Sequence, residues 1–111
     1  MANVYLNSKL DLVNTSDTVL YTVPSNSRSI VKSILVSEDA GSGTTINLTL
    51  TNATGSVFSI FKLKAVGANT TIQLLTEPLV LLESEILKVQ AADANELHVI
   101  ATILEINRED S

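Results

Sequence analysis

Residues 28–37, which read R-S-I-V-K-S-I-L-V-S, decide the fold that we predict for this chain. Successive side chains of an extended strand point to opposite faces. The alternation would therefore place Ile30 and Ile34 on one face, and Val31 and Leu35 on the other. β-Branched residues suit a pleated strand better than a helix, and apolar residues on both faces are typical of a strand covered on both sides. We therefore predict a central strand here.

Short apolar segments with a similar alternation recur along the chain, and turn-forming Asn, Ser, Gly and Pro residues separate them. The clearest half-exposed strand is 45–51, in which Ile46, Leu48 and Leu50 alternate with Thr and Asn. Segment 96–106 is apolar on both faces, and we predict that it is a second central strand. We expect the remaining strands at residues 9–14, 18–23, 57–64, 70–75, 79–82 and 86–91.

The region from residue 79 to residue 91 has two interpretations. The spacing of Leu79, Leu82 and Ile86 by three and four residues fits the apolar face of a helix. Its second half also alternates as a strand does, and the flanking segments are all of β type. We therefore favour two short strands, 79–82 and 86–91, joined by an acidic turn.

Eight to nine short strands at regular spacing, with no convincing helix, predict an all-β fold. We expect an antiparallel β-sandwich, like a jelly roll, in which residues 1–111 form a single domain.

The composition excludes several classes of function. The chain has 111 residues, of which 45% are hydrophobic, so it is too apolar for a disordered segment. A net charge of −5 argues against nucleic-acid binding, because phosphate contacts need basic residues. The absence of Cys excludes disulfides and thiolate metal sites. The chain shows neither a secretion signal at its start nor an apolar run long enough to cross a membrane, so we expect a soluble protein.

Three stretches carry a resemblance to a known group of proteins. They are V-L-Y-T-V-P-S-N-S-R-S-I-V-K-S-I-L-V (19–36), T-E-P-L-V-L-L-E-S-E-I-L-K-V-Q-A (76–91) and L-H-V-I-A-T-I-L-E-I (97–106). In these stretches the chain resembles small β-sandwich structural proteins of tailed bacteriophages, notably those of cyanophages. It departs from their pattern at the acidic turn, where Ser84-Glu85 stands in place of a Gly-Asp pair.

The resemblance implies a virion component that is made in the cytoplasm of a host bacterium and acts by assembly. It would be a head decoration protein or an accessory subunit of the neck or tail. Its partners would be further copies of itself and other virion proteins, such as major capsid or tail proteins. Neither a nucleic acid nor a membrane would be a partner.

The sequence contains no recognised catalytic or cofactor-binding motif, so we predict that the protein is not an enzyme and holds no cofactor. His98 is the only histidine, and a metal site built on it would need carboxylates such as Glu96. Glu83 and Glu85 could hold a hard cation if the chain were extended there, but a solvated turn is the preferred interpretation. We predict no metal site.

A neutral strand face is the candidate interface. Between residues 40 and 75 the only charged residues are Lys62 and Lys64. A face of Thr and Asn is easier to desolvate than a face of Lys or Glu. We therefore predict a homo-oligomer, a trimer or a ring, whose interface includes Thr45, Asn47, Thr49 and Thr51.

A carbohydrate-binding β-sandwich module is the alternative function. Such modules stack sugars on exposed aromatic rings, and the sequence provides few of them. The available aromatic residues are Tyr5, Tyr21, Phe58 and Phe61.

Overall fold

The computed structural model describes residues 2–107, which form nine β-strands and no helix. The strands are β1 (Ala2–Leu12), β2 (Thr18–Thr22), β3 (Ser27–Glu38), β4 (Thr44–Thr51), β5 (Val57–Val66), β6 (Thr71–Gln73), β7 (Leu79–Leu81), β8 (Ile86–Ala91) and β9 (Leu97–Asn107). The predicted all-β fold is thereby confirmed. No helix long enough to span a membrane occurs within this part of the chain.

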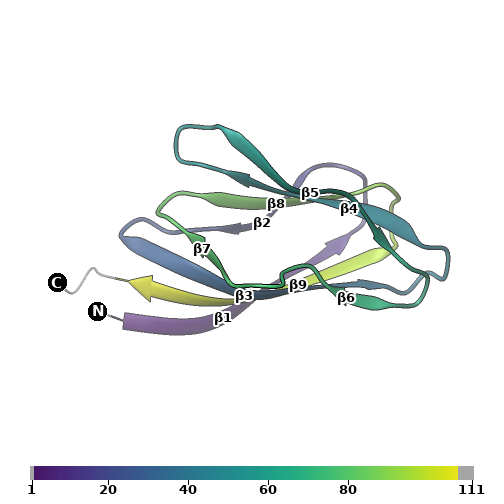
Figure 1. Cartoon of the computed structure of the whole chain (residues 1–111), viewed down its shortest axis with the longest axis horizontal. Helices are drawn as coiled ribbons and strands as arrows, with labels where there is room; N and C mark the ends of the chain where they lie inside the picture. Colours follow the sequence, from purple (N-terminus) through teal and green to yellow (C-terminus); the bar gives the residue numbers. More distant parts are fainter. Residues whose placement is uncertain (1, 108–111) are drawn as a thin grey trace.

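The strands form two antiparallel sheets that pack face to face (Figure 1). Sheet 1 has the order β1-β9-β3-β6, and β7 also pairs with β3. Sheet 2 has the order β2-β8-β4-β5. This crossing order, in which strands distant in sequence are neighbours, is that of a jelly roll, with the last strand of sheet 1 divided into β6 and β7. The sandwich prediction is confirmed at the level of topology.

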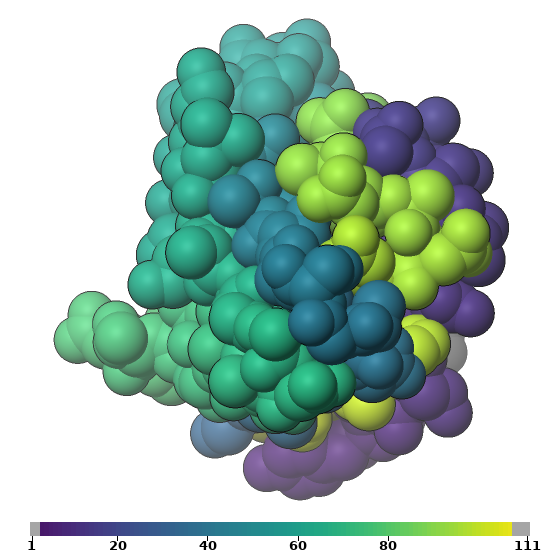
Figure 2. Space-filling view, turned by 90° about the vertical axis from the view of Figure 1, so that its right-hand side faces the viewer, coloured from purple at the N-terminus to yellow at the C-terminus, as the bar shows by residue number. Residues whose placement is uncertain are grey.

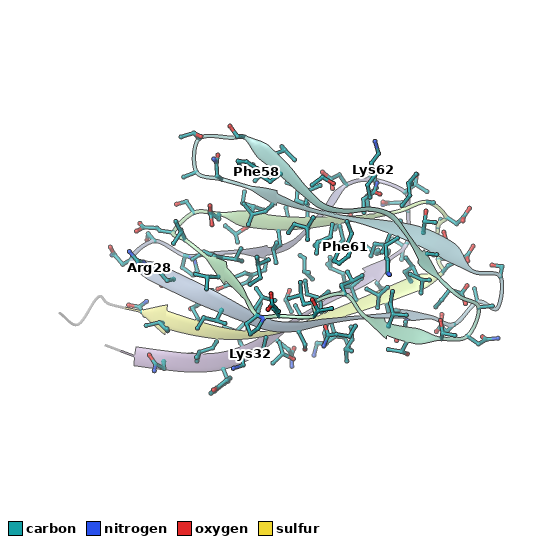
Figure 3. All side chains as sticks on the ribbon, in the orientation of Figure 1. Arg28, Lys32, Phe58, Phe61 and Lys62 are labelled. Atoms are coloured by element: carbon teal, nitrogen blue, oxygen red, sulfur yellow. The ribbon has the colours of Figure 1, made fainter. Side chains whose placement is uncertain are left out.

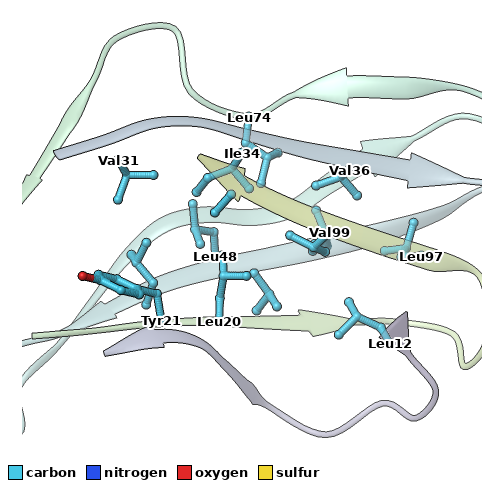
Figure 4. Packing of buried hydrophobic residues seen from close by; sticks show 14 of the residues in the cluster. Leu12, Leu20, Tyr21, Val31, Ile34, Val36, Leu48, Leu74, Leu97 and Val99 are labelled. Carbon is cyan, nitrogen blue, oxygen red and sulfur yellow. The ribbon is translucent and has the colours of Figure 1, made fainter. Parts of the chain in front are cut away.

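The two strands that we predicted to be central are central. β3 lies between β9 and the β6–β7 pair, and β9 lies between β1 and β3. Their inner faces contribute Ile34 and Val99, which are both fully buried. Figure 4 shows these side chains meeting Leu48 and Leu20 of sheet 2 between the two layers.

A β-bulge at Lys32 overturns the predicted faces of β3. The register with β9 passes from Val31↔Ile103 to Ser33↔Thr102, which leaves Lys32 as an extra residue. A bulge of this kind shifts the alternation by one. The prediction that Ile30 and Ile34 share a face is therefore wrong: Val31 and Ile34 share the buried face, and Ile30 lies on the outer one.

The predicted double covering of the central strands is also wrong. Leu35 of β3 remains 39% exposed and Ile100 of β9 remains 41% exposed. Both side chains lie on the outer face of sheet 1, which no other described element covers. Apolar residues on both faces therefore indicate here a strand with one buried face and one apolar face open to solvent.

Most strand boundaries differ from the predictions by one or more residues, and two of these differences have a structural reason. β1 begins at Ala2 and not at residue 9, because Leu6 continues the inward alternation and packs against the core. β6 ends at Gln73 and not at residue 75, because a side chain replaces the backbone acceptor there. The Gln73 Oε1 atom accepts the Ile34 N–H over 2.7 Å.

The region from residue 79 to residue 91 forms two strands, as predicted, and no helix. β7 pairs with β3 in sheet 1, and β8 lies between β2 and β4 in sheet 2, so the turn between them connects the two sheets. Ser84 in this turn has a left-handed backbone with φ of 69°. A Gly at this position would adopt the conformation without a Cβ penalty.

Candidate functional site

His98 pairs with aspartates and not with Glu96. Its Nε2 atom lies 3.3 Å from Asp11 Oδ1, and its Nδ1 atom lies 3.4 Å from Asp39 Oδ2, on the exposed outer face of sheet 1. Across residues 2–107, no group of three or more His, Cys, Asp or Glu side chains has the arrangement of a metal site. The His98 cluster is therefore an exposed set of contacts between an imidazole and two carboxylates.

Glu83 and Glu85 line a hollow with a volume of about 330 Å³ at the end of the sandwich that carries the β7–β8 turn. The hollow lies between this turn, the start of β3 at Arg28 and the tip of the β4–β5 hairpin at Asn52. The Glu85 carboxylate accepts the backbone N–H of Leu82 over 2.7 Å, and so it closes its own turn. This contact gives Glu85 a structural role.

Glu38 is a buried carboxylate that fastens two loops together at the opposite end of the molecule. Its oxygens accept backbone N–H groups from Gly41 (3.0 Å), Ser42 (3.3 Å), Gly43 (3.1 Å) and Asn69 (2.9 Å). Figure 2 shows this end, with the blue β3–β4 loop lying against the blue-green β5–β6 turn.

The pKa values of this loop cluster follow from those contacts. The N–H of Asn69, together with those of Gly41 and Gly43, lowers the pKa of Glu38 to about 2, against the opposing effect of its burial. The Ser42 hydroxyl donates to Glu96 over 2.8 Å and favours its charged form. Burial and the neighbouring carboxyl groups nevertheless raise the pKa of Glu96. The cluster fixes loops and leaves no oxygen ligands converging on an open site.

The predicted interface residues lie together on the outer face of sheet 2, where they alternate with the inward-facing Ile46, Leu48 and Leu50. They are half-buried by their neighbours on β5 and β8. The sequence analysis treated this face as neutral, but Lys88 of β8 lies opposite Thr49 and adds a positive charge. The residues concerned are Thr45, Asn47, Thr49 and Thr51.

Asn47 has a structural contact of its own. β5 bulges opposite it, and Leu63 at the bulge has a left-handed backbone with φ of 55°. The Asn47 Oδ1 atom accepts the backbone N–H of Leu63 over 2.7 Å and so satisfies a group that the ladder leaves unpaired. Thr45 and Asn47 also line a shallow hollow of about 270 Å³ that includes Gln90.

The outer face of sheet 1 carries two rows with exposed apolar side chains that sequence reasoning missed. Strand register places Tyr5, Leu104, Ile30 and Val80 in one row across β1, β9, β3 and β7. Tyr5 is 70% exposed and Val80 is 59% exposed. Four residues further along β1, a second row contains Lys9, Ile100, Leu35 and Gln73. If the predicted first strand had begun at Ala2, its alternation would have placed Leu6 on the inner face and Tyr5 on the outer face.

The exposed aromatic side chains do not form one platform. Tyr5 lies on β1 in sheet 1, whereas Phe58 lies on β5 in sheet 2. Figure 3 shows Phe61 directed into the space between the sheets and Lys62 directed away from it. Tyr21 is buried, and its hydroxyl lies 2.6 Å from both Ser29 Oγ and Glu105 Oε2. The geometry therefore gives no support to the carbohydrate-binding alternative.

Comparisons with known proteins find the same fold in several assemblies. A chain of the acidic stable capsid structure of Helicobacter pylori bacteriophage KHP30 is similar, with a TM-score of 0.56 and 9% identity over 97% of this chain and 95% of that one. A chain of the Bacillus endospore appendages, a family of disulfide-linked pili, has a TM-score of 0.53 and 7% identity over 96% and 85% of the two chains. The infectious bursal disease virus Gx strain contributes a third match, with a TM-score of 0.51 and 12% identity over 99% of this chain and 32% of that one.

No protein-family model and no curated protein sequence matches the chain. At identities of 7 to 12%, these structural matches show the fold: a jelly roll that also occurs in two viruses and in a bacterial pilus. Disulfide linkage is one feature of the pili that this chain does not share, because it has no Cys.

Proposed function

We propose that this chain is a non-enzymatic structural subunit of a tailed-phage virion, a capsid decoration protein or an accessory subunit of the neck or tail. It acts by associating with further copies of itself and with other virion proteins, such as major capsid or tail proteins. The protein is made in the host cytoplasm and carried in the particle.

The observation that carries this proposal is the near-complete mutual coverage with the phage KHP30 capsid chain, 97% in one direction and 95% in the other. A single jelly roll of this size has few places for an enclosed active site. In agreement with this, the hollows described above are shallow, the His98 contacts are exposed, and the Glu38 carboxylate is occupied by backbone N–H groups.

Self-association is proposed to use the outer face of sheet 2 around Thr49, in a trimer or a ring. A subunit in a symmetric particle presents one patch repeatedly, and a Thr and Asn face loses little on desolvation. The half-buried state of these side chains leaves their outer atoms available for contact.

Thr49→Glu is the substitution that tests this face. Asn47→Lys is unsuitable because it would remove the acceptor for the Leu63 N–H. Thr49→Lys is unsuitable because its charge would face that of Lys88 on the neighbouring strand. Thr49→Glu charges the face while placing a carboxylate opposite Lys88, so we expect a lower mass by light scattering with little change in melting temperature. The matched control is Thr102→Glu on the exposed outer face of sheet 1. Equal masses for the two variants would exclude this face as an interface.

The virion role is tested by mass spectrometry of purified particles of the phage that encodes the chain, separated into heads and tails. We expect the chain in one fraction, at a copy number set by the particle's symmetry. Its absence from intact particles would refute the virion role.

A further inference from the structure

We propose that the open edge of β1 pairs in antiparallel fashion with β1 of a second copy, so that the two copies of sheet 1 become one continuous sheet about a two-fold axis. This inference rests on the proposed assembly role, and it adds to it a second contact, distinct from the outer face of sheet 2.

The other sheet edges are protected against pairing. β2 has five residues and a register shift at Leu20, whose carbonyl oxygen accepts the Ser8 hydroxyl. β5 has two register shifts and carries Lys62 and Lys64. β6 and β7 have three residues each, and Pro78 lies in the segment that separates them. Short strands, bulges, Lys and Pro are the usual means by which proteins prevent edge pairing.

β1 has none of these protections along most of its length. It pairs with β9 over 11 residues without a register shift, and no other described strand pairs with its second edge. Its exposed side chains include Val4 and Tyr5, and within the strand only Lys9 and Asp11 are charged. A long, regular and partly apolar edge of this kind is a template for another strand.

The β1 sequence is self-complementary in one full-length register, centred on Asn7. Tyr5 then lies opposite the partner's Lys9, and Asn3 lies opposite the partner's Asp11, by the alternation of the strand. No like charges face each other, and each Tyr–Lys pair allows a cation–π contact. A register shifted by two residues would shorten the ladder and place Tyr5 against the partner's Asp11.

The same register joins the apolar rows of the two copies. The row that ends at Tyr5 would continue into the row that begins at the partner's Lys9 and contains the partner's Ile100. On the inner face, Val4 would lie opposite the partner's Leu10, so that the exposed Val4 side chain loses contact with water. The two-fold axis thus exchanges the two rows.

A single cysteine tests the pairing directly, because the natural chain has none. Residues directly opposed across antiparallel strands have Cα atoms about 4.5–5.5 Å apart, which lies within the range for a disulfide. We expect Asn7→Cys to form a disulfide-linked dimer under mild oxidation at micromolar concentration. The matched control, Val57→Cys on the exposed edge strand β5, should cross-link at least about tenfold more slowly.

A charge exchange provides the second measurement. Tyr5→Lys places two positive charges opposite each other at each of the two symmetric positions, and we expect the dimer Kd to rise roughly tenfold or more. The double variant Tyr5→Lys with Lys9→Glu restores complementary pairs, and its Kd should return towards that of the natural chain. Val57→Lys is the control that should leave the Kd unchanged.

Equal cross-linking at positions 7 and 57, or no recovery in the double variant, would overturn the pairing of β1 edges. If the natural chain still associates in that case, the edge inference fails and the proposed assembly role survives. If the natural chain is a monomer and Cys at position 7 forms no dimer, both the edge inference and self-association in solution fail.

Discussion

At the scale of single residues, Glu38 couples the stability of two loops to the charge of its carboxylate. Its carboxylate is the common acceptor for the β3–β4 loop and for Asn69, so two loops depend on one negative charge. A carboxylate that accepts several backbone N–H groups favours its ionised form in the folded state.

The pH dependence of unfolding tests this role. The pKa of Glu38 is about 2 in the fold against an ordinary 4.5, so its contribution to stability is present above about pH 4.5 and is lost as the pH falls towards 2. Glu38→Gln should lower the melting temperature at neutral pH and flatten its decline in this acid range. The control Glu77→Gln, in an exposed loop, should keep the decline of the natural chain. A decline of the same size in Glu38→Gln would contradict the role of Glu38.

The residue-level features that the sequence did not reveal are those that depend on distant partners. Alternation predicted the exposed and buried positions around Ile46 correctly, because they depend only on strand geometry. The left-handed backbone of Leu63 could not be predicted, because it depends on an Asn47 acceptor from another strand. The burial of Glu38 likewise requires N–H donors from loops that the fold brings together.

At the scale of elements, the central position of β3 and β9 determines how much of the core each carries. Ile34 and Val99 are both completely buried between the sheets. Ile34→Ala should lower the free energy of unfolding by about 2–5 kcal/mol, through lost transfer energy and a residual cavity, and Val99→Ala should cost somewhat less.

Chemical denaturation of both variants measures this cost. The control is Leu35→Ala, whose side chain lies on the exposed outer face of sheet 1 and should cost less than Ile34→Ala. If the unfolding free energies of the Ile34 and Val99 variants equal that of the natural chain, the two strands do not hold the core.

Element types were predictable and element edges were not. The period-two alternation identified segments overlapping all nine strands, and it favoured strands over a helix between residues 79 and 91 correctly. It could not show the bulge at Lys32, because the residues around Lys32 are apolar at positions of both parities and so fit either alternation. For the same reason it assigned Ile30 to the wrong face.

At the scale of the whole molecule, two surfaces are available for contact between copies. The polar face around Thr49 was predicted from the scarcity of charge between residues 40 and 75, and its use as an interface remains a proposal. The edge of β1 required the topology, because only the pairing of all nine strands shows which edge is unprotected. Sequence patterns thus indicated a face, whereas the fold was needed to find an edge.

The mass of the chain in solution tests the central claim of assembly most directly. Multi-angle light scattering across micromolar concentrations should give a multiple of the 11.9 kDa chain mass, and pairing of β1 edges requires that multiple to be even. The mass should fall towards 11.9 kDa on dilution, and Tyr5→Lys should move that transition to higher concentration. A mass of 11.9 kDa at every concentration would contradict self-association, and a stable trimer would contradict the two-fold pairing.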